Sequence, residues 1–391
     1  MEQVKLRILD PNLQLLCELK PSYFLYTRHF FKPNTFVIKM SYSLDTAQYL
    51  MKKNIVLYYT NGVWRTGVIR KRIKRFERGL KTIEVSGSCY GNWEKKQLYD
   101  STYELTGKDS QRDFAETVIK NYVDRNLITN AGSRVIPNLT LESDIRRGVS
   151  VNYDARFQEF TQMFEEIYWK SGLGWDVEYD PVNLFKFCVY QGRNLSSSQV
   201  FHVIMSEKFR TVESIEVVDD DTNAYDTAYV YGTGVDAARV GNISVVLNSV
   251  ETNGWGCTFV QMPDYVSYRN LSITGGTLGE GRSEIYVDAS DLDTSDKLKN
   301  KGMEVLNQNY GKLSMSFTFL QGGSWTYGTD FNIGDIVTVQ DDEYEEDMRI
   351  IKVDEVWTDQ LRLNITCGND PEDLVSKTKK RFDMLSNGMR V

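Results

Sequence analysis

The sequence predicts a mainly β protein with a few helices. Short β-type segments recur along the chain, turn residues separate them, and aromatic residues are abundant, with 23 Tyr and 18 Phe among 391 residues. Aromatic and β-branched side chains suit pleated, half-buried surfaces, and aromatic residues are also enriched at protein interfaces. The length favours two or three domains. We therefore expect a multidomain β-rich protein that makes extensive contacts.

Composition and charge exclude several classes of protein. The net charge is -8 at pH 7 and the isoelectric point is about 5.1, which argues against a dedicated, sequence-specific nucleic-acid binder. No run approaches the ~20 apolar residues of a membrane span. The N-terminal segment has no signal-peptide pattern, so we expect synthesis and folding in a cytoplasm. The five cysteines are far apart and include no C-x-x-C pair, which predicts buried thiols: Cys17, Cys89, Cys188, Cys257 and Cys367.

Most of the chain has the pattern of strands. The predicted strands are short, rich in β-branched and aromatic residues, and bounded by Gly, Asn and Asp. The main ones cover residues 35–42, 54–60, 80–87, 185–192, 227–232, 243–250, 282–290, 312–319 and 335–340.

Three helices are expected between these strands. Ser110 and Asp113 form a capping-box pattern that would open the first helix. The second would run from about Asp154 to Gly172, with the glycine as its stop, and the third from about Ser295 to Tyr310. Their apolar stripes indicate core faces: Phe114, Val118, Ile119, Tyr122 and Val123; Phe157, Phe160, Phe164, Ile167 and Tyr168; Leu298, Val305 and Leu306.

The chain also contains an internal repeat. Residues 50–90 resemble residues 332–368, with Ile55 matching Ile336 and Gly87 matching Gly368 at an offset of 281. The apolar alternation of the last strand needs an offset of 280, and a β-bulge would absorb that slip. The repeat predicts two similar antiparallel units that flank a helix-containing middle, and chance similarity of hairpins is the alternative.

Cys89 is a candidate nucleophile, because it lies in a G-x-C-x-G turn after a strand. That order resembles a nucleophile elbow. The base would have to be His29 or His202, because the chain has only two histidines. The preceding hairpins do not build the parallel sheet that such an elbow requires, so we interpret Cys89 as part of an ordinary turn.

Two binding motifs are also incomplete. Gly232, Gly234 and Ala237 satisfy G-x-G-x-x-A, but too few residues follow for the helix that would bind a phosphate. Asp219, Asp221 and Asn223 match the opening of a calcium loop, whereas Ala224 and Val230 stand where Gly and Glu are required. The sequence therefore predicts no catalytic residue, no metal and no cofactor.

The main charge feature is a basic run within residues 65–78. On a strand, Arg70, Arg72 and Lys74 would share one face, with Ile69 and Ile73 on the other face beside Lys71 and Arg75. Such a run is either a solvated hairpin or a functional surface at a subunit boundary or channel. The acidic segment Asp341–Asp347 lies in the corresponding hairpin of the second unit, so complementary charges would suit subunit pairing. The candidate interface residues are Arg70, Arg72, Lys74 and Arg75.

Seven segments of the sequence, taken in order, resemble the siphophage tail-tip proteins that are related to the trimeric baseplate hubs of contractile-tailed phages. The resemblance rests on GVIRKRIKRFERGLKTIEVSGSCYGNW, AETVIKNYVDRNLI, SGLGWDVEYD, FKFCVYQGRNL, NAYDTAYVYGTG, GRSEIYVDASDL and NIGDIVTVQ, and it covers nearly the whole chain. It implies a homotrimer that forms a ring, caps the hexameric tail tube or contacts a distal tail protein, and lies at the virion tail tip. The implied fold has two similar antiparallel β-barrels, a middle domain and an insertion.

The resulting domain prediction has five parts. The first β-barrel would cover residues 1–107, the middle domain 108–200, the second barrel 201–236 and 312–368, the insertion 237–311, and a C-terminal tail 369–391. The chain ends after that polar tail, so the spike, fibre or hydrolase of the tail is expected to be a separate protein, and a tape-measure protein is a further expected partner. A carbohydrate- or receptor-binding tail protein is the main alternative, followed by a Cys-dependent hydrolase.

Overall fold

The computed structural model of the chain divides into two compact units. The first comprises Met1–Glu216 and Met315–Gly368, and the second includes Val217–Ser314. The described residues are 4–99, 107–129, 131–182, 184–220, 222, 224–225, 227–232, 243–246, 251–252, 258–259, 283–289, 298, 301–302, 305–306, 309 and 312–368.

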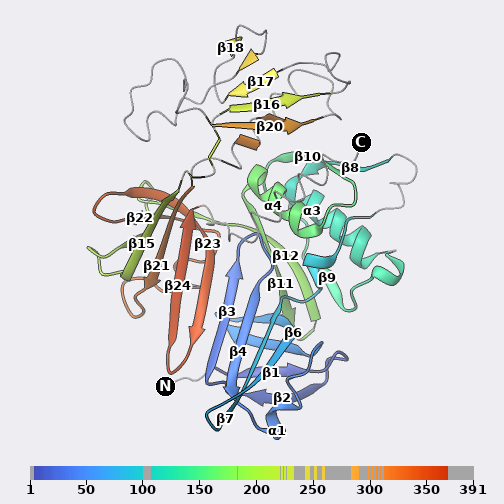
Figure 1. Cartoon of the computed structure of the whole chain (residues 1–391), viewed down its shortest axis with the longest axis vertical. Helices are drawn as coiled ribbons and strands as arrows, with labels where there is room; N and C mark the ends of the chain where they lie inside the picture. Colours follow the sequence, from blue (N-terminus) through green and yellow to red (C-terminus); the bar gives the residue numbers. More distant parts are fainter. Residues whose placement is uncertain are drawn as a thin grey trace. The chain divides into compact units, whose positions relative to one another are not determined.

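The N-terminal half of the first unit is a curved antiparallel sheet (Figure 1). Its strands pair in the order β2-β1-β5-β6-β7-β4-β3. Their bounds are β1 Leu6–Leu9, β2 Leu15–Leu19, β3 Tyr23–His29, β4 Thr35–Ser41, β5 Ile55–Thr60, β6 Val63–Glu77 and β7 Leu80–Ser88. The short helix α1 (Leu44–Ala47) begins at Ser43, whose hydroxyl accepts a hydrogen bond from the Thr46 amide. One face of the sheet encloses a core that includes Phe24, Phe36, Ile69 and Val85.

A second group of strands continues this sheet. The group pairs in the order β15-β21-β24-β23-β22. Its strands are β15 Val212–Asp220, β21 Lys312–Phe319, β22 Ile336–Gln340, β23 Glu345–Trp357 and β24 Leu361–Gly368. The short strands β13 (Asn194–Leu195) and β14 (Ile204–Ser206) add to β22 in parallel. An antiparallel ladder between β3 and β23 joins the two groups.

The two groups are structural repeats. The pairing order β3-β4-β7-β6-β5 in the first matches β15-β21-β24-β23-β22 in the second, and in both the five strands follow the same order along the chain. Ile55 faces Val68, and Ile336 faces Arg349, so both strands of this pair keep an offset of 281. The predicted strand order of the repeat and the offset of 281 at Ile55 are confirmed. The similarity of Val68–Lys71 to Ile350–Val353 predicts an offset of 282, and this is wrong because Val68 corresponds to Arg349. The second unit is inserted between β15 and β21.

The one-residue slip within the repeat has a different cause from the one predicted. A β-bulge follows Ile69 in β6, and another follows Ile350 in β23, at equivalent positions. Because both copies carry the bulge, it cannot produce the slip. Beyond the equivalent pairs Phe76–Lys81 and Trp357–Leu361, the first hairpin contains four residues and the second contains three. Gly87 therefore corresponds to Cys367, and the predicted match of Gly87 with Gly368 is wrong.

The bulge also changes which side chains share a face. Ile69 faces Gly87 and Arg72 faces Val85, so Ile69 and Arg72 lie on the same side of the sheet. The sequence predicted Ile69 on the opposite face from Arg72 and Lys74. That assignment is wrong because one extra residue in a strand reverses the facing of the residues beyond it.

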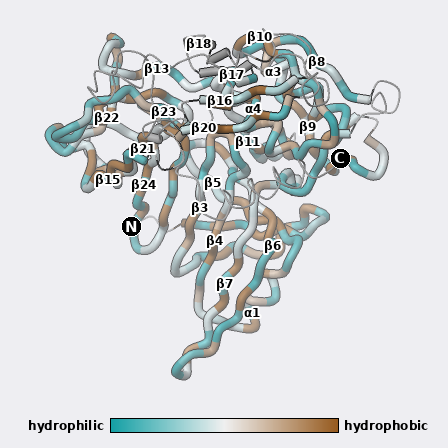
Figure 2. The backbone as a smooth tube through the Cα atoms, turned by 45° about the horizontal axis from the view of Figure 1, so that its top comes forward, coloured by the Kyte–Doolittle hydropathy of each residue, from teal (hydrophilic) through white to brown (hydrophobic). Residues whose placement is uncertain are grey.

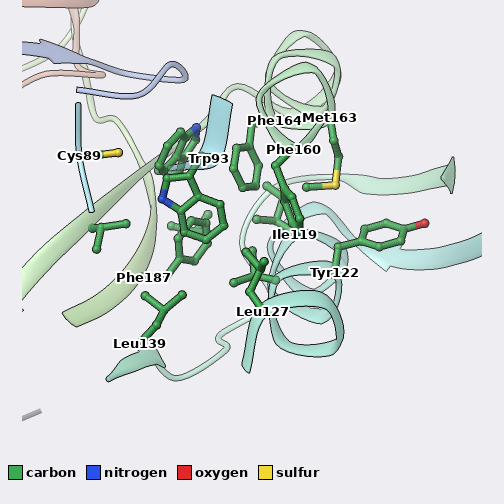
Figure 3. Packing of buried hydrophobic residues seen from close by; sticks show 14 of the residues in the cluster. Cys89, Trp93, Ile119, Tyr122, Leu127, Leu139, Phe160, Met163, Phe164 and Phe187 are labelled. Carbon is green, nitrogen blue, oxygen red and sulfur yellow. The ribbon is translucent and has the colours of Figure 1, made fainter. Parts of the chain in front are cut away.

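Between the two groups, the chain builds a middle region around two helices. The helices are α3 (Ala115–Val123), continued by a π-helical turn η2 (Asp124–Ile128), and α4 (Phe160–Ser171). Further elements are η1 Trp93–Lys95, β8 Asp109–Phe114, η3 Gly132–Arg134, β9 Leu139–Leu141, β10 Ser150–Ala155, β11 Leu173–Asp180 and β12 Leu184–Gln191. Strand β11 pairs with β12 and also with β6, and β9 pairs with β12 in parallel. Figure 3 shows side chains of both helices packed around Trp93 and Phe187.

The first two predicted helices exist, with corrected starts. Ser110 and Asp113 lie in strand β8, which pairs with β10, so the capping box is wrong, and no side chain caps α3. The second helix begins at Phe160 rather than near Asp154, because residues 150–155 form β10. Phe157 is consequently 45% exposed and does not belong to the buried stripe. Gly172 ends α4 in the left-handed conformation, as predicted.

The second unit contains a five-stranded sheet with the order β18-β19-β17-β16-β20. Its strands are β16 Thr227–Tyr231, β17 Ile243–Val246, β18 Glu251–Thr252, β19 Thr258–Phe259 and β20 Glu284–Asp288. Among the described residues of the third predicted helix, Leu298 and Leu306 are buried against Ala228 and Val230. The β-rich class with few helices is thus confirmed. No closed barrel is found in the described part of the chain, and the five predicted domain boundaries stay a prediction.

A buried ionic cluster stabilises the region where β3, β6, β11 and β23 meet. Arg65 and Asp176 form an ion pair of 2.6 Å, and Asn34 donates a hydrogen bond of 2.7 Å to the other oxygen of Asp176. Arg28 donates to Tyr327 at 2.6 Å, while Tyr58 donates to Glu355 at 2.7 Å. Burial raises the pKa of Glu355, and the charge of Arg28 opposes that effect. The four charged side chains are at most 4% exposed: Arg28, Arg65, Asp176 and Glu355.

We expect Asp176→Asn to lower the free energy of unfolding by about 3 kcal/mol, because it leaves the Arg65 charge buried beside the more distant Glu178 alone. The matched control is Glu178→Gln, which removes the second partner of Arg65. Because the Glu178 side chain is 26% exposed, the control should change that free energy by less than about 1 kcal/mol. Urea unfolding of both variants measures the difference, and equal effects would contradict the assigned role of Asp176.

Candidate assembly interface

The basic run lies on the second half of β6. The strand pairs with β7 from Val68 to Glu77, as the sequence predicts for a hairpin, and Lys71, Lys74, Arg75 and Phe76 are exposed. The β6–β7 hairpin projects from the sheet and ends in a hydrophilic turn (Figure 2). Phe76 is 67% exposed and Leu80 is 72% exposed. The hairpin therefore presents cations and two large apolar side chains to its surroundings.

Several of these cations are partly held by their own chain. Arg72 donates a hydrogen bond to the Ala47 carbonyl at 3.1 Å, and the Lys74 ammonium lies 4.1 Å from the centroid of the Tyr42 ring. Arg75 donates to Glu84 at 2.8 Å, and this hydrogen bond lowers the pKa of Glu84. Two buried guanidinium nitrogens, Nε of Arg70 and Nε of Arg72, have no hydrogen-bond partner among the described residues. The basic surface is thus ordered but incompletely neutralised.

The acidic segment Asp341–Asp347 forms the β22–β23 hairpin turn and the start of β23. Asp341 accepts hydrogen bonds from the amides of Glu343 and Tyr344, so this residue stabilises the turn. Asp342, Glu343, Glu345 and Asp347 are exposed. Both charged hairpins exist, but the acidic β22–β23 hairpin corresponds to β5–β6 and the basic hairpin is β6–β7. The predicted correspondence of the two charged hairpins is therefore wrong.

Cys89 lies in a hydrophobic environment (Figure 3). It is 1% exposed, and it belongs to the core cluster around Trp93. Burial raises the pKa of the Cys89 thiol well above its ordinary value, and the charge of Asp176 adds to this effect. The thiolate is the nucleophilic form of cysteine, so this environment opposes the chemistry that a hydrolase would need.

The histidines and the two incomplete motifs add no site. The amide of His29 donates to Asn34, and His202 is an exposed residue whose Nδ1 lies 3.1 Å from the Gln199 carbonyl oxygen. Gly234, Ala237, Asp221 and Asn223 lie outside the described residues. Within the described part of the chain, no group of three or more His, Cys, Asp or Glu side chains could hold a metal ion, and no helix is long and apolar enough to cross a membrane.

The sequence analysis did not single out one charged element, the acidic strand β15. Its sequence, VESIEVVDD, contains four carboxylates and no cation. The sequence contains this run of acidic residues, but the motif that it indicates at Asp219 is the opening of an incomplete calcium loop. Without the sheet topology, nothing indicated that this strand occupies the place in the second group that β3 occupies in the first.

A comparison with protein families identifies the chain. The family described as Siphovirus ReqiPepy6 Gp37-like protein matches residues 5–369. The chain belongs to this family. The predicted relationship to siphophage tail proteins is therefore shown.

Two solved structures of tail proteins share the fold. The 43 kDa tail protein of prophage MuSo2 from Shewanella oneidensis has a TM-score of 0.56 at 11% identity, covering 95% of this chain and 98% of that one. The tail protein from Neisseria meningitidis MC58 has a TM-score of 0.51 at 10% identity, covering 94% and 97%. A chain of the activated phage P2 baseplate gives 0.47 at 10% identity, covering 94% and 100%. No curated protein sequence gives a significant match.

We expect Cys89→Ala to leave particle function unchanged. The substitution removes one buried atom, so it should lower the free energy of unfolding by about 1 kcal/mol through the small cavity that it leaves. Infectivity of particles that carry the variant is the measurement, with thermal unfolding of the purified chain as the control for folding. Loss of infectivity by a folded and assembled variant would instead support a Cys-dependent hydrolase.

Proposed function

We propose that this chain is the structural hub of a phage or phage-like tail tip. In this proposal, three copies form a ring at the virion tail tip, cap the hexameric tail tube or contact a distal tail protein, and connect it to a separate spike, fibre or hydrolase. A tape-measure protein is a further candidate partner. The tail role is supported by membership of the siphovirus family and by a fold that tail proteins share.

The observation that carries the ring is the duplicated group of strands. Two groups with the same strand order and register give each chain two similar surfaces. Three such chains would present six similar surfaces, which suits a hexameric tube. Heterologous contacts between copies can close into a ring when the rotation between neighbours is fixed.

Two measurements test the proposed ring. Light scattering of the purified chain gives its mass, which should be three times 45.1 kDa. Imaging of the isolated particles should show the chain as a ring at the end of the tube. A monomeric chain inside intact tails would contradict the trimer without affecting the family assignment.

Reversing the charges of Arg70, Arg72 and Lys74 to Glu should weaken ring formation or tube docking. The difference from the wild type should be largest at low ionic strength and should shrink as salt rises, because exposed charges are screened over about 10 Å at 0.1 M. Particle assembly across ionic strength is the measurement.

The matched control for this variant reverses three exposed cations elsewhere, Lys5, Lys20 and Lys52, with the same change in net charge. Thermal unfolding checks that both variants fold, since Arg72 and Lys74 contact their own chain. If assembly of the first variant equals that of the control at every ionic strength, the basic strand has no part in assembly.

A further inference from the structure

The ladder between β3 and β23 provides a template for a contact that has no repeat equivalent among the described residues. Six residue pairs form this ladder, from Phe24 opposite Trp357 to His29 opposite Lys352. By the register of the repeat, Lys352–Trp357 corresponds to Lys71–Phe76 of β6. By strand order, β3 corresponds to β15. The repeat equivalent of this ladder would therefore join β15 to the second half of β6.

The required edge of β6 is open in a single chain. On one side β6 pairs with β7 throughout its second half, whereas on the other side β5 reaches only as far as Val68. No described strand pairs with that side beyond the bulge. Burial reflects this difference. Val353 and Glu355 of β23 are fully buried, but the corresponding residues Arg72 and Lys74 are partly or fully exposed.

The edge of β15 is open as well. In the described part of the chain, β15 forms a ladder with β21 alone. Glu213, Ser214 and Glu216 are exposed, whereas Phe24 and Tyr26 of the equivalent strand β3 are at most 2% exposed. In Figure 1, β15 lies at the outer border of its group, and β3 lies against β23. An unpaired strand edge is a ready template for pairing with another chain.

The charges of the two edges are complementary. Residues 70–75 of β6 contain five cations and no acid, and β15 contains four acids and no cation: Arg70, Lys71, Arg72, Lys74 and Arg75; Glu213, Glu216, Asp219 and Asp220. Opposite charges across antiparallel strands are favourable, and like charges directly opposite are unfavourable. Pairing of β6 with β6, or of β15 with β15, is therefore disfavoured. The charges select a contact between different edges, which is the type that generates rings.

We propose that β15 of one copy pairs edge to edge, in antiparallel orientation, with Lys71–Glu77 of β6 in the next copy, so that the sheet continues from chain to chain. This inference rests on the proposed self-assembly and names the surfaces that carry it. The occupant of each edge is a second copy of this chain. Backbone hydrogen bonds supply the pairing, and the charges supply the choice of partner.

A charge swap tests the proposal. We expect Lys71→Glu/Arg75→Glu to weaken self-association at low ionic strength at least about tenfold, and Glu213→Lys/Glu216→Lys to do the same, because each replaces attraction between the basic and the acidic edge by repulsion. The four changes combined should restore the dissociation constant to within about threefold of the wild type. Sedimentation across concentration gives the dissociation constants, and circular dichroism checks the fold of each variant.

The control is Asp342→Lys/Glu343→Lys, which makes the same charge change on the exposed β22–β23 hairpin. It should leave the dissociation constant within about threefold of the wild type. If this control weakens association as much as the β15 variant, or if the combined variant is not restored, the proposed pairing is overturned while the ring itself stands. A wild-type chain that is monomeric at every concentration and in intact tails would overturn the ring.

Hydrogen exchange gives an independent readout that does not depend on substitutions. In the wild-type oligomer, amides on the open edges of Lys71–Glu77 and Val212–Glu216 should exchange at least about tenfold more slowly than in the dilute monomer, since new backbone hydrogen bonds protect them. Protection that is independent of concentration in both segments would overturn the pairing.

Discussion

The antiparallel ladder between β3 and β23 is the contact on which the first unit depends. It connects two strand groups that are otherwise separated in sequence by the middle region and the inserted unit. The ionic cluster lies beside it, with Arg28 from β3, Arg65 from β6, Asp176 from β11 and Glu355 from β23. Buried charges of this kind are stable only with well-placed partners. The ladder and the cluster therefore stabilise each other: the strands position the charges, and the ion pair and hydrogen bonds of the charges hold the strands together.

The structural repeat extends to single residues. The bulge at Arg70 recurs at Ile351, and the registers before and after it agree between the copies once the one-residue difference between the two hairpin ends is taken into account. A bulge reverses the facing of the residues beyond it, so its retention preserves which side chains enter the core. The chemistry at the equivalent positions has nevertheless diverged. Val353 and Glu355 are buried in β23, which pairs with β3. The equivalent residues of β6, Arg72 and Lys74, lie on an open strand edge.

The strands and their repeat could be predicted from the sequence because alternation and turn residues are local signals. The strands around Val37, Tyr58 and Val339 were all found in place. The helix starts were mispredicted because β8 and β10 pair with each other, and that long-range contact outweighs the local capping pattern at Ser110. The acidic edge of β15 could not be predicted either. Its significance depends on which strand it replaces in the repeat, and only the topology reveals that.

An open edge also exposes a chain to unwanted pairing, so the charges on β6 and β15 have two consequences. Strand edges attract other strands without regard to sequence, and charged side chains are a common means of limiting such association. A uniformly basic edge repels its own kind, and so does a uniformly acidic one, whereas the two attract each other. The same side chains can therefore keep free chains apart from incorrect partners and admit the correct one. The buried ladder between β3 and β23 needs no such selection, because its two strands belong to one chain. There Phe24 and Val353 are buried, and the charged residues Arg28 and Glu355 have hydrogen-bond partners within the same chain.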